Sequence, residues 1–305
     1  MTLTYAAFIM TYERPQIIVR TIEMLLQQTC PPKKIVVVDN SHTLLTQQAI
    51  EQLNSSQIQY VRVGKNIGPA GASAIGLQML ASEGYDWIYW GDDDDPPQFA
   101  NTIESLLNTA QNIPNIGIIG AVGHGFNKQK GRVVRTSDSL LSTNTYLDVD
   151  VIAGNMCMLV NAAVVQQKIL PNPDFFLNME EYEYCLRVKN AGFRVGINTA
   201  QCLAYRLKNH KYGLPERPPA TTPAKSVLWR KYYSTRNLLY LLAHTQPSRL
   251  GMLHVGIRAV VKAVVGFKKG YGYGYLNAQM ELLGVWHGVT NRMGLIVLPN
   301  NKYSL

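Results

Sequence analysis

The sequence is organised around the stretch Trp-Ile-Tyr-Trp-Gly-Asp-Asp-Asp-Asp-Pro-Pro at residues 87–97. Its aromatic, apolar first half has the length of a strand, and the two prolines at its end stop that strand from continuing. The four aspartates of residues 92–95 therefore lie at the carboxyl end of a strand, which is where ligands bind in open α/β sheets. Adjacent carboxylates repel one another unless a cation or solvent compensates them.

A bound divalent cation is one explanation of this acidic run. Mg²⁺ and Mn²⁺ take oxygen ligands, and they often bridge carboxylates to the phosphates of a substrate. A solvated acidic turn is the other explanation, and the run by itself favours neither.

Length and composition limit the class of protein. With 305 residues, of which 47% are hydrophobic and 16% charged, the chain accommodates one large α/β domain with an appendage, or two domains. The cysteines show no CxxC or paired spacing, so we interpret them as reduced core thiols of a cytoplasmic protein. They are Cys30, Cys157, Cys185 and Cys202.

The positive charge is concentrated in one part of the chain. The net charge is +9, and residues 217–280 contain ten Lys or Arg and no Asp or Glu. Residues 6–10 are too short for a signal-peptide core, and no run of 18 apolar residues is free of charge. We therefore expect neither a targeting signal nor a transmembrane helix.

Apolar runs alternate with amphipathic stretches in the first part of the chain. This alternation predicts a parallel sheet with helices on both faces. The expected strands are residues 5–11, 34–39, 57–63, 87–91 and 116–121, and the expected helices are 15–27, 68–82 and 99–110. We expect a hairpin or mobile loop at 123–142 and a flexible loop at the Gly-Tyr repeat of 270–275.

Polar residues follow three of the expected strands, at residues 11–14, 39–41 and 65–71. They would line up along one edge of the sheet, where an aspartate can accept hydrogen bonds from a ribose and glycines let a ligand approach the backbone. Asp39 taken alone is also typical of a turn or helix cap. No GxGxxG motif or Walker lysine is present, so dinucleotide-binding and P-loop proteins are excluded.

A second acidic cluster, Glu180-Glu181-Tyr182-Glu183, begins another expected helix. The helix dipole favours acids in a first turn, so the cluster has a purely structural explanation. Its functional explanation is a general base, which must reach the reacting atoms. That requires the fold to bring this cluster opposite residues 92–95.

The motifs taken together resemble glycosyltransferase family 2 in order and spacing. They are residues 11–14, 38–41, 66–71, 92–95 and 180–187. In addition, Tyr-Tyr-Ser-Thr-Arg-Asn at 232–237 is similar to a segment of the galactofuranosyl- and rhamnosyltransferase-like branch.

This resemblance implies a GT-A fold, α/β with a mostly parallel central sheet, over residues 1–215. Residues 1–95 would form the nucleotide-binding half and 96–215 the acceptor half, followed by a basic, mainly helical region at 216–305. The implied reaction is inverting transfer from a nucleotide-diphosphate sugar, UDP-galactofuranose or else dTDP-rhamnose, to a glycan or lipid-linked acceptor. A divalent cation, Mn²⁺ or Mg²⁺, is the implied cofactor.

The resemblance also assigns roles to individual residues. The implied base is Glu181, where the family usually has Asp, with Glu180 as the alternative. The implied metal ligands are Asp92, Asp94 and His210, although a register of residues 93–95 also fits the motif. The implied donor-binding residues are Thr11, Tyr12, Arg14, Asp39, Asn66, Gly68, Asp92 and Asp93.

The basic tail predicts a membrane partner. His254, Arg258 and Lys262 recur every four residues and so line one face of a helix over 252–267. Such a helix is typical of proteins that lie on anionic lipid, although it could also pack on the catalytic domain with its basic face in water. No nucleic-acid module is recognised. We therefore expect a cytoplasmic enzyme of polysaccharide synthesis, attached peripherally to the inner face of the membrane.

Two other functions remain open from the sequence. A nucleotidyltransferase would use a similar sheet, but the first loop lacks the Gly-rich, Arg- or Lys-containing sequence that such enzymes generally have. A catalytically silent sugar-nucleotide binder in a polysaccharide assembly complex is the second, and the intact carboxylate clusters argue against it.

Overall fold

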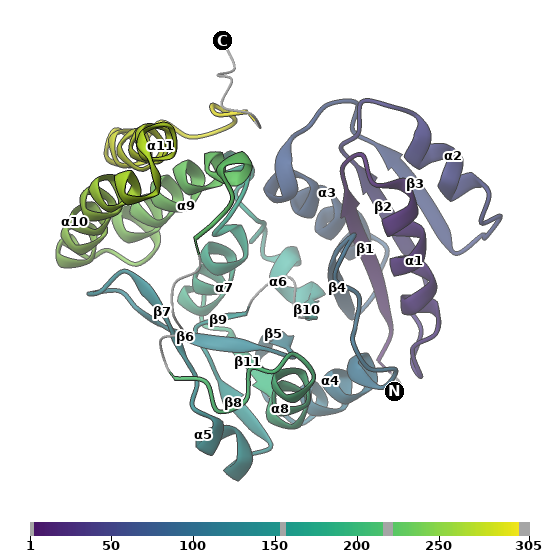
Figure 1. The fold of residues 1–305 in the computed structure, drawn as a ribbon. Helices are drawn as coiled ribbons and strands as arrows, with labels where there is room; N and C mark the ends of the chain where they lie inside the picture. The colour runs from purple at the N-terminus through teal and green to yellow at the C-terminus, as the bar shows by residue number, and fades with distance from the viewer. Residues whose placement is uncertain (1–2, 153–156, 216–221, 299–305) are drawn as a thin grey trace.

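The central feature of the fold is an eight-stranded sheet with the order β3-β2-β1-β4-β10-β5-β11-β8 (Figure 1). The computed structural model describes residues 3–152, 157–215 and 222–298. The first four strands are parallel to one another, and each carries the apolar run that predicted it. They are β1 (Tyr5–Thr11), β2 (Ile35–Asp39), β3 (Ile58–Arg62) and β4 (Trp87–Asp92).

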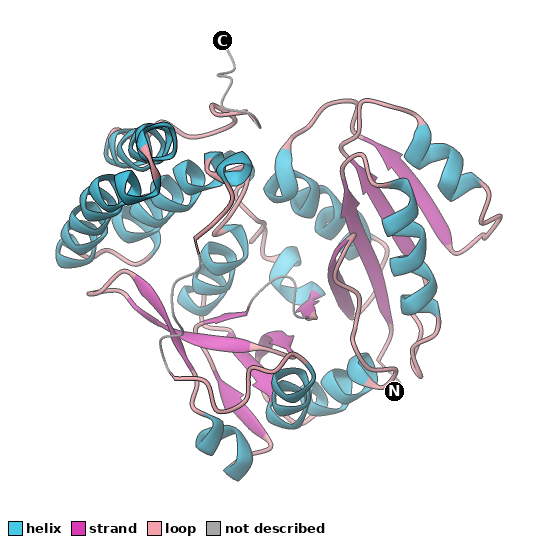
Figure 2. Ribbon diagram, in the orientation of Figure 1, coloured by secondary structure: helices cyan, strands magenta, loops and turns pink. Residues whose placement is uncertain are grey.

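Helices cover both faces of these parallel strands (Figure 2). Right-handed crossovers place α1 (Pro15–Leu26) and α2 (Leu45–Glu51) on one face. The connection from β3 to β4 runs in the opposite direction, so α3 (Gly68–Ser82) covers the other face. Small residues let α3 lie directly on β1, since a Cβ at Gly76 would be 2.3 Å from the ring of Phe8.

The second half of the sheet is mixed, because β10 is antiparallel to both β4 and β5. Residues expected as a hairpin or loop form the hairpin β6–β7 and then α5, and this hairpin belongs to a small sheet of order β7-β6-β9. The strands are β5 (Ile116–Gly120), β6 (Gly123–Asn127), β7 (Arg132–Arg135), β8 (Tyr146–Asp148), β9 (Val151–Ile152), β10 (Met158–Asn161) and β11 (Arg194–Asn198). The helices are α4 (Thr102–Gln111), α5 (Asp138–Thr143), α6 (Ala162–Gln166), η1 (Pro173–Phe175), α7 (Glu180–Asn190) and α8 (Thr199–Lys208).

The C-terminal region forms a layer of packed helices beside the hairpin β6–β7 (Figure 1). Its elements are η2 (Lys225–Val227), α9 (Trp229–Tyr240), the π-helical turn η3 (Leu241–Thr245), α10 (Arg249–Val265), η4 (Gly266–Lys269) and α11 (Tyr271–Val289). The expectation of a flexible loop at residues 270–275 is therefore wrong, because α11 begins at Tyr271 with Gly270 as its N-cap. Glycine here serves packing, since a Cβ at Gly274 would be 2.5 Å from the Phe267 ring.

The basic face of α10 lies partly against the rest of the protein. His254 Nδ1 is 2.7 Å from the carbonyl oxygen of Gln129, and Arg258 Nη2 donates to the carbonyl of Gly131 at 2.6 Å. Both acceptors belong to the turn of the hairpin β6–β7, whose carbonyls need donors. Arg258 is therefore half-buried against the hairpin, whereas His254 and Lys262 remain exposed, so the basic face is only partly directed outward.

The expectation that no helix could cross a membrane also needs correction. Among the described residues, Arg249–Lys269 is long and apolar enough to do so by length and composition, and an 18-residue window within it has a mean hydropathy of 1.6 and is 28% buried. A search for an apolar run without charges missed this helix. Arg258 and Lys262 interrupt the run, but the mean hydropathy remains high enough for a membrane span.

We predict opposite effects of alanine at two helical glycines. A Cβ at Gly284 of α11 would be 2.8 Å from the backbone carbonyl of Tyr232 in α9, so Gly284→Ala should separate the helices and destabilise the protein by about 1–3 kcal/mol. Gly256→Ala in α10 is the matched control. Nothing lies within 4 Å of its Cβ, so it should stabilise by about 0.5–1 kcal/mol. Chemical unfolding measures both, and equal effects would contradict the close packing of α9 on α11.

Candidate active site

The first acidic segment is fixed by the end of the neighbouring parallel strand. β1 and β4 pair in register with Met10 opposite Asp92, so Thr11 stands beside Asp93. The Thr11 hydroxyl donates to Asp93 Oδ2 at 2.6 Å, and the Thr21 hydroxyl donates to the Asp93 carbonyl at 2.5 Å. Asp93 is thus buried and anchored to both β1 and α1.

Arg14 joins the buried and the exposed part of this segment. Its Nη1 donates to Asp93 Oδ1 at 3.0 Å and to Asp94 Oδ2 at 2.7 Å. The side chain of Asp94 is 54% exposed, so it remains accessible to a ligand while the arginine orients it. One guanidinium therefore compensates two of the aspartates at the strand end.

The second acidic segment is held by the C-terminal region. Before Glu180 the backbone has positive φ at Phe176 (60°), Asn178 (65°) and Met179 (70°), which is uncommon outside glycine. The Asn237 amide donates to the carbonyls of residues 175, 177 and 178 at 3.0, 2.8 and 2.7 Å. These bonds stabilise the unusual backbone that leads into α7.

Arg236 completes this arrangement. Its Nε donates to Asn237 Oδ1 at 2.9 Å, which orients the amide, and its Nη2 donates to the carbonyls of Asp174 and Phe175 at 3.2 and 2.9 Å. Both side chains are fully buried. We call Arg236 and Asn237, with the carbonyls of residues 174–178 that they bind, the carbonyl clamp.

The two acidic segments line one cleft of about 580 Å³. It lies at the carboxyl ends of β1 and β4, which is where the strand pattern predicted a ligand. The lining residues are Met10, Thr11, Tyr12, Arg14, Asn40, Asn66, Pro69, Asp92, Asp93, Asp94, Phe176, Leu177, Asn178, Glu180, Glu181, Trp229 and Arg230.

Carboxylates in this cleft outnumber the cations that could compensate them. Burial raises the pKa of Asp92 well above its usual range, and the charges of Glu181 and Asp94 raise it further. Burial also raises the pKa of Glu181, and burial together with Glu181 raises that of Glu180. Glu180 Oε2 is buried without a hydrogen-bond partner. The cleft therefore favours protons or an added cation.

Several residues named by the resemblance lie elsewhere. Asp39 is buried and does not line the cleft, because it accepts bonds from Tyr60 Oη (2.7 Å) and the Ser41 amide (2.8 Å). Gly68 has a φ of +72°, and a Cβ there would be 2.0 Å from the Phe176 carbonyl oxygen, so this glycine lets α3 approach residues 174–178.

His210 and Asp95 also lie outside the lining of the cleft. His210 is exposed just after α8, where the neighbouring Lys208 and Asn209 donate to Gln98 at 2.7 and 2.9 Å. Burial and Asp94 raise the pKa of Asp95 to about 7. Over the described ranges, no group of three His, Cys, Asp or Glu side chains is arranged to hold a metal by itself. The lining favours the register of residues 92–94 over 93–95.

Two lining residues were missed from the sequence. Trp229 and Arg230 begin α9, in a region that we had assigned to membrane contact. The available signal was a tryptophan next to an arginine at a helix start, shortly before the 232–237 motif. An aromatic ring beside a guanidinium suits a ring-shaped or phosphorylated ligand.

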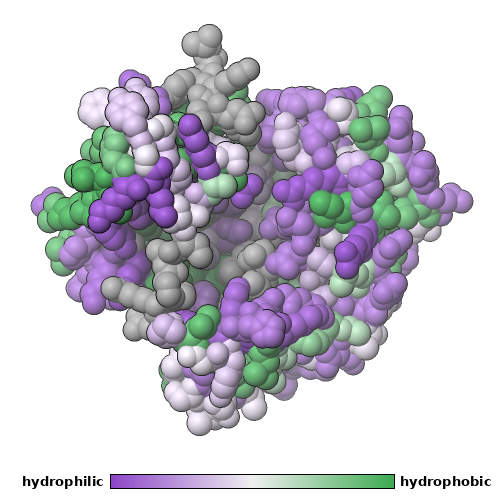
Figure 3. Space-filling view, viewed as in Figure 1, coloured by the Kyte–Doolittle hydropathy of each residue, from purple (hydrophilic) through white to green (hydrophobic). Residues whose placement is uncertain are grey.

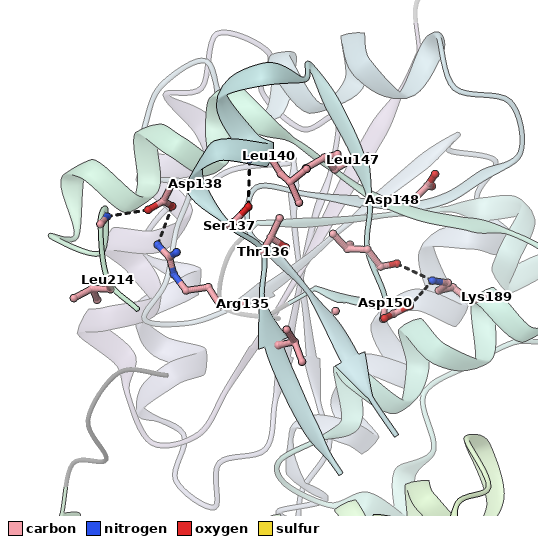
Figure 4. A pocket seen from close by; sticks show the side chains of 14 residues that line it. Arg135, Thr136, Ser137, Asp138, Leu140, Leu147, Asp148, Asp150, Lys189 and Leu214 are labelled. Atoms are coloured by element: carbon pink, nitrogen blue, oxygen red, sulfur yellow. Dashed lines mark hydrogen bonds and ion pairs between the residues drawn. The ribbon is translucent and has the colours of Figure 1, made fainter. Parts of the chain in front are cut away.

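A second cavity of about 580 Å³ lies near the other end of α7 (Figure 4). Four of its charged side chains form two pairs, Arg135 with Asp138 at 2.9 Å and Lys189 with Asp150 at 2.5 Å. These pairs join β7 to α5 and α7 to the β8–β9 connection. We therefore assign them to stability and keep the acid-lined cleft as the candidate active site.

Comparison with known proteins identifies the class. Residues 6–165 match Glycosyl transferase family 2, so the chain belongs to this family and is a glycosyltransferase. Galactofuranosyltransferase GlfT1 of Mycobacterium tuberculosis strain H37Rv is 30% identical over 114 residues, which are 36% of this chain and 37% of that protein. GlfT1 of Mycolicibacterium smegmatis is 23% identical over 256 residues, 78% of this chain and 82% of the relative.

Solved structures show the same fold. The mannosyltransferase PcManGT from Pyrobaculum calidifontis, in complex with GDP-Man and Mn²⁺, has a TM-score of 0.50 at 13% identity over 94% of this chain and 73% of that one. GalNAc-T7 with UDP, GalNAc and Mn²⁺ has a TM-score of 0.59 at 12% identity over 95% and 56%. The fold is thus that of the GT-A glycosyltransferases, as the sequence predicted.

We predict that the carbonyl clamp controls turnover. Asn237→Asp replaces the amide donors with a carboxylate facing three carbonyl oxygens, so the start of α7 should shift and kcat should fall by tenfold or more, about the effect of a small misplacement of a reacting group. Ser234→Ala is the control, because it leaves Arg236 and Asn237 in place and removes only the 3.1 Å bond from the Asn178 side chain and the 3.2 Å bond to the Arg230 carbonyl. Turnover and thermal unfolding should be measured together, and an Asn237→Asp enzyme with normal kcat would exclude this positioning role.

We also predict that Glu180→Gln stabilises the protein increasingly as pH rises. Its raised pKa means that the folded state binds the proton more tightly, so stability is present at low pH and is lost as pH rises through the folded pKa. Glutamine does not ionise, so the variant should not lose this stability as pH rises. Glu183→Gln on the same helix is the control, because Glu183 is ion-paired with Arg187 at 2.5 Å and should lose stability on substitution. Melting temperatures between about pH 5 and pH 8 test this, and parallel losses for both variants would contradict it.

Proposed function

We propose that the protein is an inverting, metal-dependent galactofuranosyltransferase. It would transfer the sugar from UDP-galactofuranose to a hydroxyl of a glycan or lipid-linked acceptor in cell-surface polysaccharide synthesis. The observation that carries the proposal is the cleft in which Asp92 to Asp94 face Glu180 and Glu181. The names of the relatives support galactofuranose over rhamnose as the sugar.

The residues of the first segment fit a divalent cation. Asp92 and Asp94 both line the cleft, and burial, with the charges of Glu181 and Asp94, raises the pKa of Asp92, which an added cation would lower. Two carboxylates completed by substrate phosphates are a common Mg²⁺ or Mn²⁺ site, so His210 is not required as a ligand. When bound, the cation supplies Lewis-acid stabilisation of charge on the departing diphosphate.

The donor would bind along the ends of β1 and β4. Thr11, Tyr12, Arg14 and Asn66 line this side of the cleft, and the guanidinium of Arg14 is the positive charge nearest the aspartates. Arginine suits a diphosphate because its planar fork donates two hydrogen bonds at once. Asp39 would then act indirectly, because its carboxylate accepts hydrogen bonds from the Ser41 amide and the Tyr60 hydroxyl and so fixes their positions.

Glu181 is our proposed base. A buried carboxylate with a raised pKa holds a proton more strongly than a solvated one, which suits removal of the acceptor hydroxyl proton. The acceptor oxygen forms its bond to the anomeric carbon as the bond to the diphosphate breaks, and the proton goes to Glu181. One displacement inverts the anomeric carbon without a covalent sugar intermediate. Glu180, with its unpartnered Oε2, is the alternative base.

We further propose that the enzyme works on the cytoplasmic face of a membrane. A lipid-linked acceptor is anchored there, and the C-terminal region carries the cations that anionic lipid attracts. This proposal is independent of the choice of donor sugar.

The test is donor-dependent transfer with matched variants. We expect UDP-galactofuranose with Mn²⁺ to raise the melting temperature more than dTDP-rhamnose does, because a ligand that binds the folded state stabilises it. Glu181→Gln should retain this shift and lose transfer by about 10²–10⁴-fold. Asp94→Ala should lose both the metal-dependent shift and transfer, whereas Asp95→Asn, outside the lining of the cleft, should keep them.

Three results would overturn parts of this proposal. Full activity of Asp94→Ala in the presence of EDTA would exclude the metal role. Normal transfer by Glu181→Gln would move the base to Glu180 or elsewhere. Donor binding without transfer to any acceptor would support a silent sugar-nucleotide binder, and pyrophosphate release from a nucleoside triphosphate would indicate a nucleotidyltransferase.

A further inference from the structure

The helix α10 buries small side chains and exposes large apolar ones. It buries small residues at four-residue spacing, Gly251, Val255, Ala259 and Ala263. Its large apolar side chains point outward and are between 50% and 67% exposed. These are Leu250, Leu253, Ile257, Val260, Val261 and Val264. A helix on the surface of a soluble protein has the reverse pattern.

The helix α11 repeats this pattern beside it. It buries three polar side chains, Asn277, Glu281 and His287, against its neighbours. It exposes large apolar and aromatic ones, namely Tyr271, Tyr275, Leu282, Trp286 and Val289. Two adjacent helices thus expose their large apolar side chains, which does not arise from a single misplaced residue.

Exposed apolar side chains of the two helices meet at a groove. A groove of about 680 Å³ lies between α10 and α11, lined by apolar side chains including Leu253, Ile257, Val260 and Val289. Figure 3 shows hydrophobic residues gathered over α10 at the left edge of the molecule. We call this surface, made of the exposed residues just named on α10 and α11, the outer face. Exposed apolar surfaces of this kind mark binding to another protein or to a membrane.

We infer that the outer face inserts into one leaflet of an anionic lipid membrane, with α10 and α11 lying parallel to its surface. This mode of binding rests on the membrane attachment proposed above, and it replaces attraction between charges with apolar insertion as the main source of affinity. Attachment would depend on buried apolar area, and the basic residues would add only a preference for anionic lipid.

The charge around the outer face favours lipid over a second copy of the chain. Within residues 222–298 the only carboxylate side chain is Glu281, which is 1% exposed and lies 3.8 and 3.7 Å from the ammonium groups of Lys231 and Lys262. Exposed cations surround the apolar residues at Arg249, Lys268 and Lys269. A twofold dimer would bring these cations together with no acid to meet them, whereas lipid phosphates complement them.

Contacts of α10 favour lying on the membrane over crossing it. His254 and Arg258 bind carbonyls of the hairpin β6–β7, and Asn277 Nδ2 donates to the Lys262 carbonyl at 2.7 Å. One flank of the helix is therefore held by protein over three turns. The aromatic rings of α11 suit the boundary between head groups and acyl chains, where Tyr and Trp are enriched.

Flotation with vesicles tests the inference. We expect the full-length protein to float with vesicles that contain phosphatidylglycerol and to stay bound at about 1 M salt, which screens charges but not apolar insertion. The double variant Ile257→Glu/Val264→Glu should lose at least tenfold in partitioning. Leu140→Glu is the matched control, because Leu140 of α5 is 51% exposed outside the outer face, and it should float normally.

Other readouts separate this inference from the proposed activity. The double variant should keep the donor-dependent thermal shift and transfer to a soluble acceptor, and lose only transfer to acceptor embedded in vesicles. Release of the wild-type protein by salt would overturn apolar insertion in favour of electrostatic attachment. A wild-type dimer that becomes a monomer in the double variant would assign the outer face to a second copy.

Discussion

The geometry of the cleft depends on the carbonyl clamp. Three non-glycine residues with positive φ, Phe176, Asn178 and Met179, precede α7, and such conformations cost on the order of 1–3 kcal/mol each. Hydrogen bonds from Arg236 and Asn237 offset that cost. Both donors belong to α9, so the helical region is a structural part of the candidate active site. The glycosyltransferase family match ends at residue 165, yet this chain completes its site with residues well beyond it.

Repulsion among carboxylates is the second constraint, and it opposes stability. Burial raises the pKa values of Asp92, Glu180 and Glu181, and neighbouring carboxylates raise those of Asp92 and Glu180 further. A core designed for stability alone would avoid this arrangement. Arg14 compensates Asp93 and Asp94 but leaves the others uncompensated. The stability lost here is the cost expected if the proposed base and the proposed cation-binding edge share one small volume.

Sequence reasoning succeeded where local patterns determine structure and failed where distant packing does. The bounds of β1 and α3 were predicted correctly, because a buried strand and a helix with a Pro near its start have strong local signals. The Gly-Tyr repeat of 270–275 gave a turn signal, but packing of Gly274 on Phe267 made it helical. The orientation of α10 depends on carbonyls of a hairpin more than 120 residues away, which periodicity cannot indicate. Trp229 lies in the C-terminal region that was assigned to membrane contact as a whole, and its place in the lining of the cleft likewise depends on distant packing.

The helix α9 links the cleft to the outer face. Its first residues, Trp229 and Arg230, line the cleft, and its far side packs closely on α11 through Gly284 and Gly288. If the outer face lies in lipid, the membrane surface is only about one helix layer, or roughly 10 Å, from this edge of the cleft. An acceptor whose lipid stays in the bilayer would then reach Glu181 along α9, passing the exposed guanidinium of Arg230, which suits a phosphate between lipid and glycan. The glycines between α9 and α11 thus set how far such an acceptor must extend, because larger residues there would move the cleft away from the membrane.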